Sequence, residues 1–153
     1  MAKRFPLQTL LDLAQNQSDE AGRKLQLLKV KWQEAEQKLT QLTIFRDEYR
    51  NRLLQNTQQG MQMAAWREFQ LFMDKLDKAI GFQVDEVAKC KQRWEAGQRE
   101  WLERQRQMKA YDTLSQRHAV SEAKREAKTE QNEQDEFAGK SVNSRQDKED
   151  RHE

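Results

Sequence analysis

The segment "QNTQQGMQM", residues 55–63, separates two long runs in which apolar residues recur every seven positions. Asn56, Thr57 and Gly60 are residue types that end a helix and let the chain restart in a new direction. Because a similar length of repeat lies on either side of the segment, it predicts the turn of a helical hairpin rather than the middle of one long helix.

The run before the turn contains two apolar registers four residues apart, which is the spacing from d to a in a coiled coil. The d series begins at Leu7 and the a series at Leu11, and twelve of the fourteen positions are apolar, with Ser18 and Arg46 the exceptions. The repeat resumes in a new phase from Trp66, where eleven of fourteen positions are apolar. A 35% hydrophobic chain would place about ten apolar residues at these positions by chance.

These patterns predict an all-α fold, a long two-helix antiparallel coiled coil with a helical overhang and a disordered C-terminal tail. The expected elements are helix 1 at about 5–55, a turn at about 56–63 and helix 2 at about 64–138, forming a hairpin at 1–138 and a tail at 139–153. Residues beyond Ser115 outrun the first helix, and from Gly139 the sequence is polar and has no seam. The pairing places Trp32 near Val87 and Cys90. The flanking charges do not decide between the hairpin and a parallel homodimer.

The charge balance argues against several classes of function. The chain of 153 residues carries a formal net charge of +2, and its charges are interspersed, so no basic face for nucleic acid is expected. Its one cysteine, Cys90, excludes an internal disulfide framework and favours a reducing compartment. No apolar run has the roughly 18 residues of a membrane span. We therefore expect a cytoplasmic protein.

No group of residues indicates catalysis. His118 and His152 lie in the expected overhang and tail, away from Cys90, and their spacing is not that of a metal site. The glycines stand alone rather than in a phosphate-binding loop. Carboxylates on a solvated two-helix coiled coil lack the enclosed pocket that acid–base chemistry uses. The sequence predicts no enzyme, no cofactor, no metal and no small-molecule substrate.

The most informative aromatic residues lie beside the seam. Phe45 and Phe72 occupy g positions, and in an antiparallel hairpin they are expected to face each other along one edge, with Ala79 at the next g position. One interpretation is a wider core near the turn. The other is an exposed patch that binds another protein. Both remain open from the residues alone.

Two further features carry alternatives. Polar seam residues either fix the register of the two helices or contact a partner; they are Arg46, Gln83, Gly97 and Arg104. We expect Gly97 to make room for Trp94 and Trp101. At the N-terminus, Leu10 and Leu13 lie outside the seam beside the overhang, where they form either a second binding site or a frayed helix end.

An ordered set of segments resembles the flagellar FliJ family over roughly residues 5–138. The segments are "LQTLLDLA" (7–14), "FRDEYR" (45–50), "WREFQLFMDKLDKAI" (66–80) and a second helix that contains tryptophans. The resemblance implies a non-catalytic part of the bacterial flagellar type III export apparatus, similar in fold to the central stalk of rotary ATP synthases. The alternatives are a general chaperone, or an escort of export chaperones, and a purely structural dimeric coiled coil.

The resemblance also implies partners and a location. The partners would be the hexameric ring of the export ATPase (FliI), whose assembly the protein promotes, and the cytoplasmic region of the export gate protein FlhA. Export chaperones and the ATPase regulator FliH are further expected partners. The free protein is expected to be a monomer. It would lie in the cytoplasm, associated peripherally with the inner membrane at the flagellar base.

Two sets of site residues follow from the same resemblance. The expected gate-binding patch consists of Lys38, Leu42, Phe45, Tyr49, Phe72, Leu76, Ala79 and Gln83. The end expected to bind the ATPase ring contains Leu10, Leu13, Trp101, Arg104 and Tyr111.

Overall fold

The computed structural model describes residues 3–151, which form two helices, α1 (Gln8–Gln58) and α2 (Met63–Glu149). The chain divides into two compact units. The hairpin unit contains residues 17–104, and the terminal unit joins the first sixteen residues to those from Gln105 onward. The predicted all-α helical hairpin is confirmed. α1 begins at Gln8 rather than at about residue 5, both helices end later than expected, and the turn is shorter.

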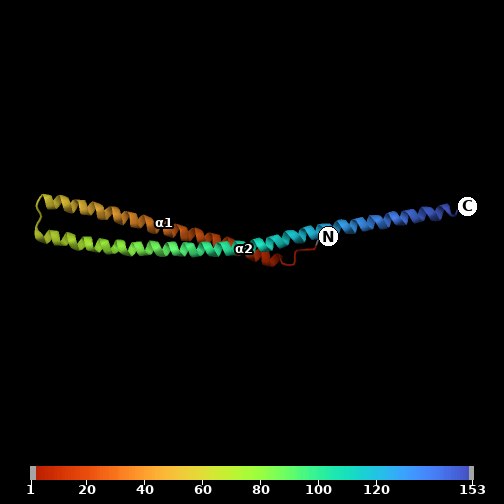
Figure 1. Ribbon diagram of the computed structural model, residues 1–153, viewed down its shortest axis with the longest axis horizontal. Helices are drawn as coiled ribbons and strands as arrows, with labels where there is room; N and C mark the ends of the chain where they lie inside the picture. Colours follow the sequence, from red (N-terminus) through yellow and green to blue (C-terminus); the bar gives the residue numbers. More distant parts are fainter. Residues whose placement is uncertain (1–2, 152–153) are drawn as a thin grey trace. The chain divides into compact units, whose positions relative to one another are not determined.

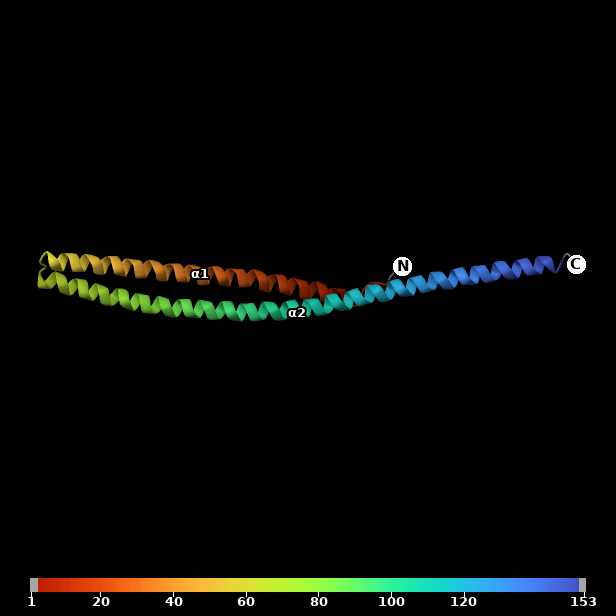
Figure 2. The same ribbon diagram turned by 45° about the horizontal axis from the view of Figure 1, so that its top comes forward.

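Within the hairpin unit, α1 and α2 run side by side in opposite directions away from the turn (Figures 1 and 2). The buried side chains of this unit all occupy predicted a or d positions; they are Ser18, Ala21, Ala35, Met73, Leu76, Gln83 and Cys90. Small residues on α1 leave space for large ones on α2, as where Gly22 lies against the indole of Trp101. The heptad seam is therefore the core of the hairpin.

Trp32 makes one contact that the sequence-based expectation did not include. The ring of Trp32 packs against that of Trp94, with centroids 5.2 Å apart, so its aromatic partner lies one helical turn beyond Cys90. Two indoles that face each other can tilt and share one layer of the seam, which the sizes of single residues do not reveal.

The turn depends on one glycine. Gly60 has a φ of 88°, a left-handed conformation that L-residues with a side chain adopt only under strain. Its N–H donates to the carbonyl of Thr57 at 3.3 Å, which satisfies one of the last carbonyls of α1. Asn56 and Thr57 lie inside α1, and the Thr57 hydroxyl donates back to the carbonyl of Leu53. Gly60 thus ends the helix, while Asn56 and Thr57 do not.

In the terminal unit, the N-terminal segment packs on α2 further along than the sequence indicates. The rings of Phe5 and His118 lie 5.5 Å apart, and the backbone N–H of Lys3 reaches the carboxylate of Glu122 at 3.5 Å. The sequence predicts that α2 has no intramolecular partner after Ser115, but these contacts continue through Glu122. These contacts come from the residues before α1, which lie along α2.

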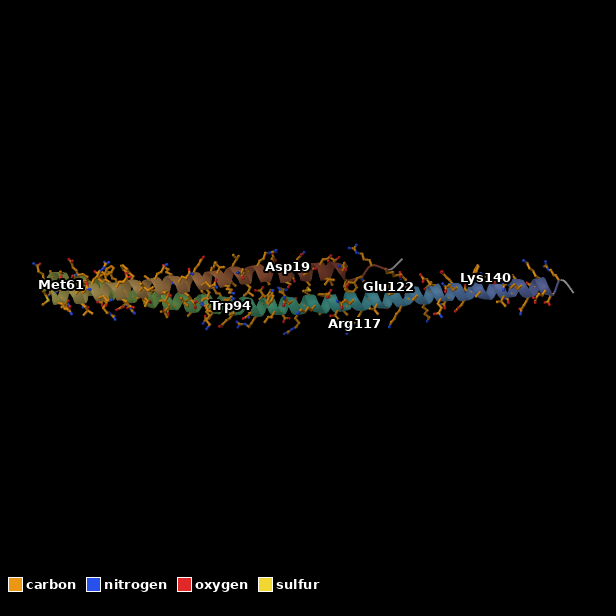
Figure 3. The ribbon with its side chains drawn as sticks, turned by 90° about the horizontal axis from the view of Figure 1, so that it is seen from above. Asp19, Met61, Trp94, Arg117, Glu122 and Lys140 are labelled. Atoms are coloured by element: carbon orange, nitrogen blue, oxygen red, sulfur yellow. The ribbon has the colours of Figure 1, made fainter. Side chains whose placement is uncertain are left out.

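The final part of α2 is helical to Glu149, whereas the sequence predicts a helix to about 138 and disorder from 139. Its side chains are exposed, and no second helix lies beside Lys140 among the described residues (Figure 3). Glutamine, glutamate, lysine and arginine favour a helix through their intrinsic propensity even without packing. Residues 152 and 153 of the predicted tail lie outside the described part of the chain.

Neither α1 nor α2 has a stretch both long and apolar enough to cross a membrane, as judged over residues 3–151.

Candidate protein-binding surfaces

Four aromatic rings gather near the turn and bridge α1 and α2; this aromatic cluster consists of Phe45, Tyr49, Phe69 and Phe72. The Phe72 ring lies 4.5 Å from that of Tyr49 and meets Phe45 edge-on at 6.2 Å. Tyr49 also packs on Phe69 at 5.0 Å, which ties the cluster to the seam. The predicted g-to-g pairing of Phe45 and Phe72 is therefore present as a ring contact.

The aromatic cluster is partly self-covered and partly open to solvent. Phe45 remains 44% exposed and Phe72 36% exposed, although each contacts Tyr49. Each of the two sequence-based interpretations thus describes part of the geometry. The rings widen the core near the turn, and two of them still present an apolar edge of the kind that binds proteins.

The other residues of the expected gate-binding patch differ in accessibility. Lys38 is exposed, and Leu42 and Ala79 are half-buried. Leu76 and Gln83 are buried in the seam, and the Gln83 amide donates a 2.9 Å hydrogen bond to the carbonyl of Ala35. The accessible part of the patch is therefore centred on Phe45 and Phe72.

Polar residues on the seam have partners within the hairpin unit. Arg46 lies 3.6 Å from the carboxylate of Asp77 on α2. The guanidinium of Arg104 donates to the side-chain oxygen of Gln17 at 3.2 Å. These contacts between helices fit a role in fixing the register.

Gly97 accommodates a different residue from the one expected. A Cβ added to Gly97 would lie 2.7 Å from Cδ1 of Leu28 and 3.5 Å from Cδ1 of Leu25, both on α1. The glycine thus makes room for leucines of the opposite helix, not for Trp94 and Trp101 of its own. A seam position faces the opposite helix, so a side chain added there meets residues of that helix first.

The residues expected to bind the ATPase ring fall in both units. In the terminal unit, Leu10 and Leu13 are exposed and Tyr111 is half-buried. In the hairpin unit, Trp101 packs on Gly22, and Arg104 is held by Gln17. Leu10 and Leu13 are the members of this set that keep a free apolar surface.

Comparison with known proteins shows which family the chain belongs to. A family model described as the flagellar FliJ protein matches residues 3–147. The chain belongs to the flagellar FliJ family. The FliJ proteins of Escherichia coli K12 and Salmonella typhi are each 30% identical to it over 138 residues, which cover 90% of this chain and 94% of each relative. Membership in the FliJ family supports a role as a component of the flagellar export apparatus.

A further apolar surface of this FliJ-family chain lies at the turn, and sequence reasoning missed it. Thr57, Met61, Met63 and Trp66 line a hollow of about 330 Å³ at the end of the hairpin unit, where Figure 3 labels Met61. Trp66 lies at a predicted a position but remains 41% exposed, and it lines this hollow together with Thr57 of α1. The heptad pattern gave no signal for this exposure, because it assigns Trp66 to the seam.

No cluster of three or more His, Cys, Asp or Glu side chains is arranged to hold a metal ion in residues 3–151.

Proposed function

We propose that this chain acts as a non-catalytic coupling protein of the flagellar type III export apparatus. One end of the protein binds the hexameric export ATPase and promotes its assembly, and the aromatic cluster binds the cytoplasmic region of the export gate protein FlhA. The carrying observation is the Phe45–Phe72 ring pair, which is both exposed and held on a rigid support.

The geometry supports a binding role for this pair. Aromatic side chains contribute strongly to protein interfaces because each buries a large area with few rotatable bonds. Tyr49 contacts both Phe45 and Phe72 and also packs on Phe69 of the seam. The rings are thus ordered before a partner arrives, so binding loses little side-chain entropy.

The contact with the ATPase is supported by Leu10 and Leu13, which stay exposed on α1 beside the contacts of Phe5 and Lys3 with α2. Coupling further requires that the ATPase and the gate each change the free energy with which the other binds. Such a protein works at the cytoplasmic face of the inner membrane, at the base of the flagellum.

The test compares Phe72→Ala with Phe82→Ala, a matched loss of a phenyl ring on the same helix. Phe82 is 75% exposed and has no aromatic contact among the described residues. We expect Phe72→Ala to weaken binding to the cytoplasmic region of the gate protein at least tenfold, measured by calorimetry, and Phe82→Ala to leave it unchanged. Thermal unfolding of both variants shows whether the hairpin remains folded.

If Phe72→Ala binds the gate protein with the same affinity as the parent protein, the proposal that the aromatic cluster binds the gate is wrong. If Phe72→Ala instead lost binding to export chaperones while it kept the gate, the escort function would replace coupling. If Phe72→Ala loses both its fold and its binding, the test is repeated with Phe45→Ala, because the Phe45 ring is more exposed. A folded Phe45→Ala variant that binds the gate protein as the parent does would also reject the proposal.

A further inference from the structure

The turn end of the hairpin unit carries only positive charge. Between Glu48 and Glu68 the sequence contains no Asp or Glu, while Arg50, Arg52 and Arg67 all fall in this interval. The three arginines are exposed and form no ion pair within the described chain. We call residues 49–67 the tip. All charged side chains of the tip are therefore basic.

The tip also exposes large apolar side chains. Met63 is 66% exposed and Trp66 41% exposed, and both line the hollow at the turn with Met61. Leu54 is exposed on the last turns of α1. In the sequence these residues flank Gly60, so they lie near the turn of the hairpin unit.

We propose that the tip binds an anionic lipid surface, with Met63 and Trp66 in the interfacial layer and the three arginines facing lipid phosphates. Arginines near an anionic bilayer each strengthen binding about fivefold. Tryptophan favours the boundary between headgroups and acyl chains, because its ring is apolar and its N–H is polar. The proposal goes beyond the proposed function and does not rest on it, since it concerns lipid rather than the gate protein.

The size and charge of the tip favour a lipid surface over an acidic protein. A stable protein interface buries about 800 Å² on each partner, which is more than the exposed parts of Leu54, Met61, Met63 and Trp66 supply. A bilayer needs no shape complementary to the protein. The affinity of a protein for an anionic bilayer increases with the apolar area it buries and with the attraction between opposite charges. A basic tip with a few projecting apolar groups therefore fits a lipid surface.

The first test is co-sedimentation of the full chain with vesicles of phosphatidylcholine and phosphatidylglycerol in a two-to-one ratio. We expect binding to these vesicles, none to pure phosphatidylcholine, and weakening as salt rises. The double variant Arg52→Gln/Arg67→Gln should lose at least about tenfold in affinity. The matched control Arg99→Gln removes an exposed arginine of the hairpin unit far along α2 from the tip and should bind as the parent does.

A second measurement locates the apolar contact. Lipids with brominated acyl chains should quench tryptophan fluorescence in the parent protein, and Trp66→Phe should lose this quenching while it still binds the vesicles. Met63→Ser should reduce binding several-fold, whereas Phe82→Ser, which also removes an exposed apolar side chain of α2, should not. Circular dichroism checks that each variant keeps its helices.

Several results would overturn the proposal. They are no binding to the acidic vesicles, an equal loss in Arg99→Gln or Phe82→Ser, and quenching that persists in Trp66→Phe. A polyglutamate peptide could also displace the protein completely from the vesicles and bind it as tightly as they do. That result would indicate that the tip binds an acidic protein instead. The Phe72→Ala variant should bind the vesicles as the parent protein does, whether or not it binds the gate protein. The two proposals are therefore tested separately.

Discussion

The side-chain amide of Gln83 on α2 donates a 2.9 Å hydrogen bond to the backbone carbonyl of Ala35 on α1. Gln83 is only 8% exposed, so its amide is used inside the hairpin. A polar pair buried in an apolar seam favours one register, because every other register leaves the amide without a partner. The contact also removes Gln83 from the surface that a gate protein could reach.

We predict that Gln83→Ala lowers the free energy of unfolding by about 1–2 kcal/mol, from the lost hydrogen bond and the space left in the seam. Chemical denaturation measures this loss. Lys38→Ala is the control, because Lys38 is exposed and has no contact with the seam, and it should change stability by less than about 0.5 kcal/mol. A Gln83→Ala variant as stable as the parent would contradict the role assigned to this hydrogen bond.

Substitution by alanine should have opposite effects on protein stability at two glycines of α2. A Cβ added at Gly81 would meet only open space, so Gly81→Ala should stabilise the protein by about 0.5–1 kcal/mol through helix propensity. At Gly97 the same Cβ would lie 2.7 Å from Leu28. Moving a leucine in a packed seam costs about 1–3 kcal/mol, which outweighs the gain in propensity.

Thermal melts of the two glycine variants provide the measurement. We expect the melting temperature to rise in Gly81→Ala and to fall in Gly97→Ala. Shortening the facing side chain with Leu28→Ala in the Gly97→Ala background should recover part of the loss that the added methyl group causes. If Gly97→Ala is as stable as Gly81→Ala, then Leu28 rotates away at little cost and Gly97 is not a packing requirement.

The seam could be predicted from the sequence because burial follows a fixed period. Each buried residue of the hairpin unit lies at a position that the heptad pattern selected, including the polar Ser18 and Gln83. Facing aromatic residues could be predicted as well, since Phe45 and Phe72 occupy g positions that meet along one edge. Periodicity thus supplied both the fold and the centre of the candidate site.

Features that depend on register or on irregular chain could not be predicted in this way. The ring contact between Trp32 and Trp94 was not expected, because the pairing of single residues does not show which two large side chains will share a layer. The contacts of Lys3 and Phe5 with α2 come from residues before α1, where no repeat applies. The exposure of Trp66 could not be predicted either, because the heptad pattern assigns this ring to the seam and the structure leaves it 41% exposed.

The last part of α2 should be helical but weakly protected. Beyond Glu122 its side chains are exposed except at Ser141, and an isolated helix gains little stability without packing. We predict that amide hydrogens of residues 126–149 exchange at least about a hundredfold faster than those around Cys90, as followed by mass spectrometry. Equal protection in both regions would require a partner for this segment, such as a second copy of the chain.

The free protein should be a monomer, because the buried seam of the hairpin unit is formed by two helices of the same chain. Light scattering should give the mass of one chain across a range of concentrations. A parallel homodimer would instead place Trp32 beside Trp32 of a second copy, and the contact between Trp32 and Trp94 would be absent. A mass of two chains that persists on dilution would reject the monomeric hairpin.

Replacing Trp32 with phenylalanine should lower the free energy of unfolding less than the same replacement of Trp94 does. The Nε1–H of Trp32 is buried and has no hydrogen-bond acceptor in the described chain, and a buried unpaired donor costs about 1–3 kcal/mol. Trp32→Phe removes this cost together with some apolar area, so the net change should stay within about 1 kcal/mol. Trp94→Phe loses similar area without that relief and should be the less stable variant in urea. Equal losses in the two variants would show that the Trp32 N–H has an acceptor in solution.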